Sequence, residues 1–236
     1  MTRHGIWAVV PVKAFAFAKQ RLAPALAPDE RRALSRAMVE DVLSALATAE
    51  GLAGVIVVTR DPEAMTLAER SGARVVPEPN LDGHSAAARS AAEILVREGA
   101  AAMLHVPGDV PLFTAGDVAA LLDMADLSDR VALVPAHDGR GTNAMLCAPP
   151  DAIEFRFGQD SFRRHLAAAA EAGITPLIVA CPALALDIDE PDDLQRFLRH
   201  DRDTRTGRYL HESGIAQRLS AAPRPARATD SMGAAP

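Results

Sequence analysis

Short runs rich in β-branched and apolar residues alternate along this chain with longer segments of helical periodicity, and this alternation constrains the fold more than any other feature. The first three segments are an apolar run at 6–12, a helical pattern at 29–49 and a second apolar run at 55–59. Because strands joined by a helix lie parallel, the pattern predicts an α/β fold with a mainly parallel sheet flanked by helices. Further strands are expected at 74–76, 101–106, 131–135, 144–148 and 176–181.

Residue spacing orients two of the expected helices. The 29–49 segment repeats apolar residues every four positions, which predicts a core-facing stripe of Leu34, Met38, Val42 and Leu46. Thr114 and Asp117 have capping-box spacing ahead of an apolar run, so a helix is expected to begin soon after the loop that contains Asp109. A site is expected in that loop, since strand ends form the ligand crevice of open α/β sheets.

The chain of 236 residues is 49% hydrophobic and can bury one sizeable core, so 1–219 is predicted to be a single domain. Asp192 and Asp193 fall in the first turn of a helix expected to end near residue 199, where negative charge suits the helix dipole and a structural role is predicted. Residues 200–219 have a modest apolar face and are expected to add a terminal helix. From Ser220 the composition falls to Ala, Pro, Arg and Ser, which predicts a disordered tail over 220–236.

Charge and hydropathy exclude two classes of partner. A net charge of −6 argues against a nucleic-acid binder, which needs a basic stripe to neutralise phosphates. The longest apolar stretch, 174–186, is broken by prolines and is shorter than the ~20 residues of a membrane span, and no basic and apolar leader precedes the first strand. Cys147 and Cys181 each lie in an apolar run, so buried free thiols and a reducing, cytoplasmic location are expected.

Three carboxylates placed just past apolar runs predict a divalent metal site. They are Asp109 in the 106–111 segment, and Asp187 and Asp189 in the 184–191 segment. On an extended backbone residues two apart point to the same face, so the last two can share a cation, and oxygen-only ligands favour Mg²⁺ over zinc. The alternative is that one carboxylate caps a helix and the others are solvated loop charges.

The two lysines of the chain, Lys13 and Lys19, fall in the single segment 10–22, whereas every other cationic side chain is an arginine. A compact ammonium suits a point contact to a phosphate. Arg21 in the same segment adds a third cation, so the segment is a candidate site for a polyphosphate. The alternative is a solvated basic loop.

Two glycine-containing loops are candidate phosphate cradles. In 138–143 glycines would let consecutive backbone N–H groups converge on an anion, with the Thr142 hydroxyl as a further donor; a plain turn between strands explains the glycines equally well. In 157–162 Gly158 and Ser161 precede a helix whose free N–H groups could hold an acidic group, although helix capping alone would also select polar residues there.

Other familiar sites are missing from the sequence. No Walker A motif and no G-x-G-x-x-G after a strand occur, which disfavours kinase and dehydrogenase functions. His105 lies in an apolar strand and is expected to be a hydrogen-bonded core residue, while His84 lies in a loop that could face the site. The spacing supports neither a Ser-His-Asp nor a Cys-His arrangement.

Taken together, several motifs resemble one family, the 2-phospho-L-lactate or phosphoenolpyruvate guanylyltransferases of coenzyme F-420 biosynthesis. The motifs are Val9-Val-Pro-Val-Lys13 with Lys19-Gln-Arg-Leu22, Pro107-Gly-Asp-Val-Pro111, Gly139-Arg-Gly-Thr-Asn143, Phe157-Gly-Gln-Asp-Ser161 and Asp187-Ile-Asp-Glu-Pro-Asp-Asp-Leu194. The likeness covers residues 6 to about 199. It implies a Rossmann-like (GT-A-like) nucleotidyltransferase that joins GMP from GTP to 2-phospho-L-lactate, phosphoenolpyruvate or 3-phospho-D-glycerate and releases pyrophosphate.

The resemblance also implies roles for particular residues. The expected Mg²⁺ ligands are Asp109, Asp187 and Asp189, and the expected contacts of the acceptor phosphate are Thr142, Gly158 and Ser161. The expected catalytic residues are Asp109, Lys13 and Arg21, the latter two meeting the triphosphate, and further nucleotide contacts fall to Lys19, Gly83 and Ser85. The chain departs from the family at 83–87, where relatives tend to have Gly-Leu-Asn-Ala-Ala and this chain has Gly-His-Ser-Ala-Ala. A homodimer is compatible with the resemblance.

Two rival functions fit the same patterns less well. Sugar-phosphate and molybdopterin nucleotidyltransferases usually carry a glycine-rich loop after the first strand, where this chain has Lys13-Ala-Phe-Ala-Phe-Ala. A non-catalytic nucleotide-binding regulatory domain would not need the three aspartates together with Lys13.

Overall fold

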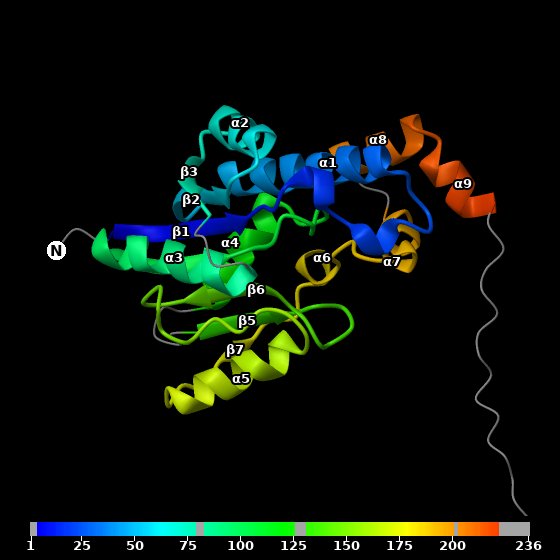
Figure 1. The fold of residues 1–236 in the computed structure, drawn as a ribbon. Coiled ribbons are helices and arrows are strands. Elements are labelled where there is room, and N and C mark those ends of the chain that lie inside the picture. The colour runs from blue at the N-terminus through cyan, green and yellow to red at the C-terminus, as the bar shows by residue number, and fades with distance from the viewer. Residues whose placement is uncertain (1–3, 79–82, 126–130, 201–202, 222–236) are drawn as a thin grey trace, which may run out of the picture.

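A computed structural model of the chain describes residues 4–78, 83–125, 131–200 and 203–221. The described residues form a seven-stranded sheet with the order β3-β2-β1-β4-β6-β5-β7 (Figure 1). The strands are β1 (His4–Pro11), β2 (Leu52–Thr59), β3 (Arg74–Pro77), β4 (Ala100–His105), β5 (Val131–Pro135), β6 (Thr142–Cys147) and β7 (Leu177–Ile178).

The sheet is mainly parallel, as the alternation of segments predicts. β1 pairs in parallel with β2 and β4, β2 with β3, and β5 with β7, while β6 runs antiparallel to both β4 and β5. The strand expected at 176–181 is only two residues long. Pro176 has no N–H to continue the ladder, and Cys181 already begins the next helix as its N-cap residue, so little chain is left to pair.

The helices for which the sequence gives positions ahead of residue 200 begin close to those positions. They are α1 (Pro28–Ala47), α2 (Pro62–Arg70), α3 (His84–Arg97), α4 (Ala115–Met124), α5 (Ser161–Glu171), α6 (Pro182–Ala185), α7 (Pro191–Phe197), α8 (Arg205–Glu212) and α9 (Ile215–Ala221), with 3-10 turns η1 (Phe15–Phe17) and η2 (Gln20–Leu22). The capping box is confirmed, because the Thr114 hydroxyl accepts the Asp117 N–H and the Asp117 carboxylate accepts the Thr114 N–H.

The C-terminal segment is two helices rather than one. Gly214, with a φ of 74°, breaks the expected 200–219 helix between α8 and α9. α9 reaches Ala221, so the chain is still helical at the first two positions of the expected tail. The remainder of that tail, 222–236, lies outside the described residues.

Helices cover both faces of the sheet and bury one apolar cluster on each (Figure 1). Alternate residues of each strand face opposite clusters: Val10 packs with the residues of α1, α2, α4 and α7, while Val9 packs with those of α3 and α5. The predicted stripe of α1 is buried, with Leu34, Met38, Val42 and Leu46 at most 1% exposed. Burial of each such side chain stabilises the fold by roughly 1.5–3 kcal/mol.

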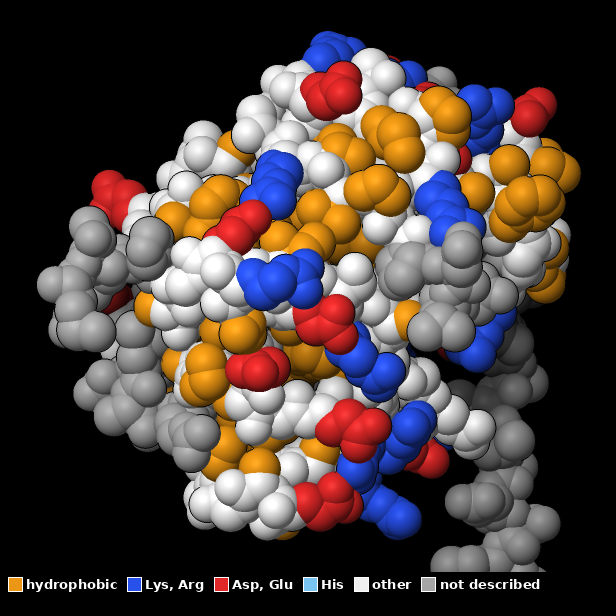
Figure 2. Space-filling model, turned by 60° about the vertical axis from the view of Figure 1, so that its left-hand side comes forward, with side chains coloured by type: hydrophobic (Ala, Val, Ile, Leu, Met, Phe, Trp, Pro, Cys, Tyr) orange, Lys and Arg blue, Asp and Glu red, His pale blue; other side chains and the backbone are white. Residues whose placement is uncertain are grey.

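Basic and acidic side chains are interspersed on the face shown in Figure 2. Ion pairs on the protein surface include Arg74 with Glu98 and Arg32 with Glu63. Within the described ranges, none of the helices combines the length and apolarity needed to cross a bilayer. Both cysteines are free, Cys147 buried and Cys181 half-buried.

Candidate active site

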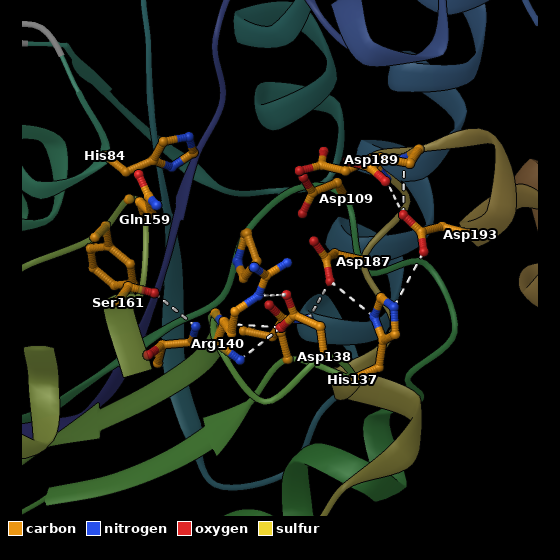
Figure 3. Close-up of a pocket in the computed structure, with 18 of the residues that line it drawn as sticks. His84, Asp109, His137, Asp138, Arg140, Gln159, Ser161, Asp187, Asp189 and Asp193 are labelled. Atoms are coloured by element: carbon orange, nitrogen blue, oxygen red, sulfur yellow. Dashed lines mark hydrogen bonds and ion pairs between the residues drawn. The ribbon is translucent and has the colours of Figure 1, made fainter. Parts of the chain in front are cut away.

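A cleft of about 890 Å³ opens where β4, β5 and β6 meet the segment between α6 and α7. Its lining includes five of the predicted site residues that come from distant parts of the chain: Asp109, Asp187, Asp189, Thr142 and Ser161. The three carboxylates lie together along one wall, and Ser161 lies on the opposite side (Figure 3). The structure therefore brings together the predicted metal ligands and the predicted acceptor contacts.

The loop after β4 places Asp109 in the cleft. Gly108 allows this loop to lie against α1, because a Cβ at that position would be 3.0 Å from Cγ2 of Val39. The backbone carbonyl of Asp109 accepts the Ile188 N–H at 3.1 Å. That bond joins the loop to the 187–189 segment and explains why residues nearly eighty positions apart share one site.

The ammonium of Lys19 lies between two of the carboxylates. Its Nζ donates to Oδ2 of Asp109 at 2.6 Å and to Oδ1 of Asp189 at 2.5 Å, and its side chain is only 7% exposed. Burial by itself lowers the pKa of Lys19, but the two carboxylates outweigh it and hold that pKa above its ordinary value. Conversely, burial raises the pKa of Asp189, but Lys19 outweighs this and keeps it below the usual range.

Asp187 has different neighbours. Its Oδ1 accepts a hydrogen bond from Nδ2 of Asn143 at 3.1 Å and lies 3.7 Å from Nδ1 of His137. Burial, together with the nearby charge of Asp109, raises the pKa of the Asp187 carboxyl. A carboxylate held beside like charge in this way is stabilised by any added cation.

Asp193 has the structural role that the sequence predicts. Its Oδ2 accepts the N–H groups of Asp189 and Glu190 at 3.1 and 2.9 Å, which shapes the turn into α7. Its Oδ1 lies 3.3 Å from Nε2 of His137 (Figure 3). His137 therefore connects Asp193 to Asp187 across the wall of the cleft.

The donor set fits a hard cation, although no metal geometry is formed. Within the described residues, no three His, Cys, Asp or Glu side chains are arranged to hold one metal ion. Instead the space between Asp109 and Asp189 already holds a positive charge, the ammonium of Lys19. Carboxylate oxygens open to one cleft are the ligands that Mg²⁺ prefers, so the chemistry fits, and sharing of one ion by Asp187 and Asp189 stays a prediction.

Strand β6 contains a β-bulge and carries two adjacent side chains, Thr142 and Asn143, that reach different parts of the site. Val134 pairs with Ala144 and Pro135 with Thr142, so Asn143 has no opposite residue and forms a β-bulge. Asn143 reaches the carbonyl of Ala185 and the carboxylate of Asp187, while the adjacent Thr142 points to the other face and reaches α5.

Ser161 begins α5, as the sequence predicts, and faces Thr142. Its Oγ accepts the Thr142 N–H at 2.9 Å. Gly158 has a φ of 114°, which side-chain-bearing residues rarely adopt, and its carbonyl accepts the Ser161 N–H at 3.1 Å. The glycine thus shapes the turn that delivers Ser161 to the cleft.

Neither predicted backbone cradle is formed by the amides expected. In 138–143 the Asp138 carboxylate itself accepts the N–H groups of Arg140 and Gly141, at 2.8 and 3.2 Å, so the segment is a turn between β5 and β6 closed by its own anion. At the start of α5 the N–H groups of Ser161 and Phe162 already donate to the carbonyls of Gly158 and Arg140. The polar atoms that this part of the cleft offers to a ligand therefore belong to side chains, among them the hydroxyls of Thr142 and Ser161 and the side chains of Arg140 and Gln159.

A second cavity of about 260 Å³ shares Asp109 and Asp189 with the larger cleft and is lined by only some of the predicted nucleotide contacts. Lys13 and Lys19 line this second cavity, whereas Arg21 lines the larger one and lies 3.8 Å from Glu190. His84 is the first residue of α3 and not a loop residue as predicted, and its side chain lines both cavities.

The 83–87 segment is hydrogen-bonded to the loop that precedes α5. Gly83 is the N-cap residue of α3, and the Ser85 hydroxyl accepts the Phe157 N–H at 2.9 Å. Ser85 thereby holds the loop that leads to Ser161. Contacts of Gly83 and Ser85 with a nucleotide stay predictions.

His105 differs from its predicted state. It is 1% exposed, but within the described part of the chain neither ring nitrogen has a hydrogen-bond partner. Burial lowers its pKa well below the usual range, so the ring is neutral. It stacks on Phe157 with the ring centres 4.1 Å apart, which makes it a packing residue beneath the cleft.

Asp61 supports the lysine-bearing segment and was missed from the sequence, although Asp61-Pro62 is a recognisable helix start. Its Oδ1 accepts the N–H groups of Glu63 and Ala64, which caps α2, and its Oδ2 accepts the Phe15 N–H at 2.9 Å. Replacing Asp61 with alanine is expected to cost about 1–2 kcal/mol in the free energy of unfolding, measured by urea denaturation. Asp61→Asn keeps an acceptor oxygen and should cost less; equal losses would contradict the capping role.

Comparisons with known proteins show the family of the chain. The family described as guanylyl transferase CofC-like matches residues 6–230. The phosphoenolpyruvate guanylyltransferase of Conexibacter woesei is 40% identical over 214 residues, which cover 90% of this chain and 96% of that protein. The 2-phospho-L-lactate guanylyltransferase of Methanothermobacter thermautotrophicus is 33% identical over 205 residues, covering 87% of this chain and 89% of that protein.

Among solved structures, one described as a nucleotide-diphospho-sugar transferase from Desulfovibrio desulfuricans has a TM-score of 0.73 at 18% identity, covering 91% of this chain and 97% of that chain. This likeness confirms the predicted Rossmann-like nucleotidyltransferase fold. The family match spans residues 6–230, and both of these relatives are more than 30% identical to the chain over most of its length. This protein therefore belongs to the CofC-like guanylyltransferase family.

Proposed function

We propose that this protein joins GMP from GTP to the phosphate of a phosphorylated three-carbon acid and releases pyrophosphate, as a step of coenzyme F-420 biosynthesis. The observation that carries the proposal is the opposed chemistry of the cleft walls, with the carboxylates Asp109, Asp187 and Asp189 on one and the hydroxyl of Ser161, which accepts the Thr142 N–H, on the other. Phosphoenolpyruvate is the acceptor proposed first, because the Conexibacter relative is named for it. 2-Phospho-L-lactate and 3-phospho-D-glycerate are the alternatives.

The reaction needs few catalytic groups from the protein. An oxygen of the acceptor phosphate forms a bond to the α-phosphorus of GTP, and the bond from that phosphorus to the bridging oxygen breaks, so pyrophosphate leaves with the electron pair. The acceptor phosphate is already ionised at neutral pH, so no general base is needed. Catalysis then rests on positioning and electrostatics, with Thr142 and Ser161 orienting the acceptor and the cations Lys13 and Arg21 facing the triphosphate.

Magnesium is the cofactor that the donor set supports. Asp109, Asp187 and Asp189 would hold it, and the bound ion would supply neutralisation of the charge on the attacking and leaving oxygens. The raised pKa of Asp187 and the position of Lys19 between the other two carboxylates both indicate a wall that favours positive charge.

Incubation of the protein with GTP, Mg²⁺ and each of the three acids is expected to give a GMP-acid product and one equivalent of pyrophosphate with at least one acid, phosphoenolpyruvate first. Mass spectrometry of the products and a pyrophosphate assay measure this directly. Removing the metal with EDTA should abolish product formation, and excess Mg²⁺ should restore it. ATP, CTP and UTP in place of GTP test the base preference.

The same assay separates the rival functions. Product with a sugar 1-phosphate, and none with any of the three acids, would favour a sugar-phosphate nucleotidyltransferase. Binding of GTP without pyrophosphate release under any of these conditions would favour a non-catalytic regulatory domain.

A further inference from the structure

The two hydroxyl groups of the cleft wall each have their oxygen occupied by an N–H group or ring nitrogen of the protein. Oγ of Ser161 accepts the Thr142 N–H at 2.9 Å, and Oγ1 of Thr142 lies 2.9 Å from Nδ1 of His165. Both hydroxyls are buried, at 3% and 6% exposure, yet both line the cleft. What they can offer to a ligand therefore depends on where their protons point.

A third hydrogen bond decides the tautomer of His165. The backbone N–H of Arg156 donates to Nε2 of His165 at 2.9 Å. A backbone N–H can only donate, so Nε2 carries no proton. Burial lowers the pKa of His165 to about 4, which leaves the ring neutral at physiological pH. The single ring proton then lies on Nδ1 and is donated to Oγ1 of Thr142.

We propose that His165 is a positioning residue whose Nδ1–H fixes the Thr142 hydroxyl with its proton toward the cleft. In this arrangement the oxygen of Thr142 is an acceptor toward His165 and its proton is free for a ligand, and the same holds for Ser161 relative to the Thr142 N–H. The wall thus presents two hydroxyl donors that match the phosphate of the acceptor acid, which has only acceptor oxygens when fully ionised. This assignment rests on the proposed function.

The ring of His165 is itself held in place. His165 follows Ser161 by four residues, so both side chains lie on the same face of α5 and meet Thr142 together. Phe157 packs against the His165 ring in a T-shaped contact with centroids 4.7 Å apart, and Phe157 itself is stacked with the rings of His105 and Phe155. Packing on one side and the Arg156 N–H on the other leave the ring one orientation.

The tautomer can be measured without any turnover. Long-range ¹H–¹⁵N correlation spectra of the ¹⁵N-labelled full chain at pH 7.5 report the protonation of each ring nitrogen of the seven histidines. The signals lost in a His165 variant identify this residue. We expect protonated Nδ1 and unprotonated Nε2, the opposite of the tautomer that free histidine prefers. A protonated Nε2 would overturn the proposal.

Two substitutions separate the positioning role from a structural one. In His165→Asn the side-chain amide lies near the position of Nδ1 and can still donate to Thr142. In His165→Gln the amide lies near the position of Nε2 and can still accept the Arg156 N–H. His165→Gln is expected to raise the KM of the acceptor acid about five- to tenfold, the worth of one hydrogen bond, with the KM of GTP unchanged. His165→Asn should change the acceptor KM less than twofold, while lowering the melting temperature more.

A double-mutant cycle with Thr142→Ala completes the test. Without the Thr142 hydroxyl, His165→Gln should have almost no further effect on kcat/KM for the acceptor. Equal effects of the two His165 variants on the acceptor KM would contradict the proposal. So would an undiminished effect of His165→Gln in the Thr142→Ala background. Neither result would contradict the proposed function if the wild-type protein turns over an acceptor acid. If wild-type protein turns over none of the acids, the proposed function fails, and the tautomer measurement still decides the state of His165.

Discussion

Replacing Asp187 with asparagine is expected to lower guanylyl transfer about 10³-fold, the equivalent of several kcal/mol of lost charge stabilisation. The fold should survive, because the new side chain can still present an oxygen to Nδ2 of Asn143, the hydrogen bond that Asp187 accepts at 3.1 Å. Removing the charge also relieves the repulsion from Asp109 that helps to raise the pKa of Asp187. Loss of activity would therefore not reflect loss of structure.

The measurement is magnesium-dependent pyrophosphate release, with the melting temperature recorded for each variant. Asp192→Asn is a matched control: it makes the same charge change at an exposed position five residues away that also lines the cleft. It should retain activity within a few-fold. If Asp187→Asn releases pyrophosphate at the wild-type rate with Mg²⁺ present, Asp187 is not a metal ligand.

Replacing Lys19 with methionine is expected to lower the melting temperature by about 4–8 °C in metal-free buffer. Removing one partner of a buried ion pair costs about 3–5 kcal/mol. The expected loss in the free energy of unfolding is smaller here, ~2 kcal/mol, because the side chains of Asp109 and Asp189 are 26% and 44% exposed and solvent screens part of their repulsion.

Added Mg²⁺ should recover part of this loss, and should raise the melting temperature of the variant more than that of the wild type, in which the ammonium competes for the same carboxylates. Arg21→Met serves as the control for stability, because that side chain is 73% exposed and its closest approach to Glu190 is 3.8 Å. A Lys19→Met protein as stable as the wild type, and indifferent to Mg²⁺, would show that the ammonium does not neutralise this wall.

Much of the fold follows from local patterns. The four-residue spacing of Leu34, Met38 and their repeats fixes α1 because a buried helix face needs that period, and the Thr114 capping box starts α4 where expected. Asp109 could be placed at the site because it follows a strand, and strand ends form the crevice of such sheets. The antiparallel direction of β6 could not be read, since a buried strand has the same apolar pattern in either direction.

The parts of the site that the sequence did not predict depend on contacts between distant residues. Lys19 is 90 positions from Asp109 and 170 from Asp189, so its bridge between them has no local signature. The bulge at Asn143 depends on pairing with β5. The filling of the 138–143 turn by its own carboxylate could have been anticipated, because Asp followed by glycines favours such turns. The sequence predicted Thr142 and Ser161 as contacts of one phosphate but did not single out His165, because only the fold brings its ring to Thr142.

The antiparallel strand β6 marks a boundary in the site between two groups of residues that come from different stretches of the chain. The residues proposed to contact GTP come from the parallel half of the sheet, on the segments that follow β1, β3 and β4, whereas the hydroxyl pair and its supporting histidine come from β6 and α5. The two halves are joined by the antiparallel pairing of β4 with β6 and by the hydrogen bond that the Phe157 N–H donates to the Ser85 hydroxyl. Descendants of such a protein can therefore drift toward a new acid by changing one contiguous stretch of gene while their use of the nucleotide stays under separate selection.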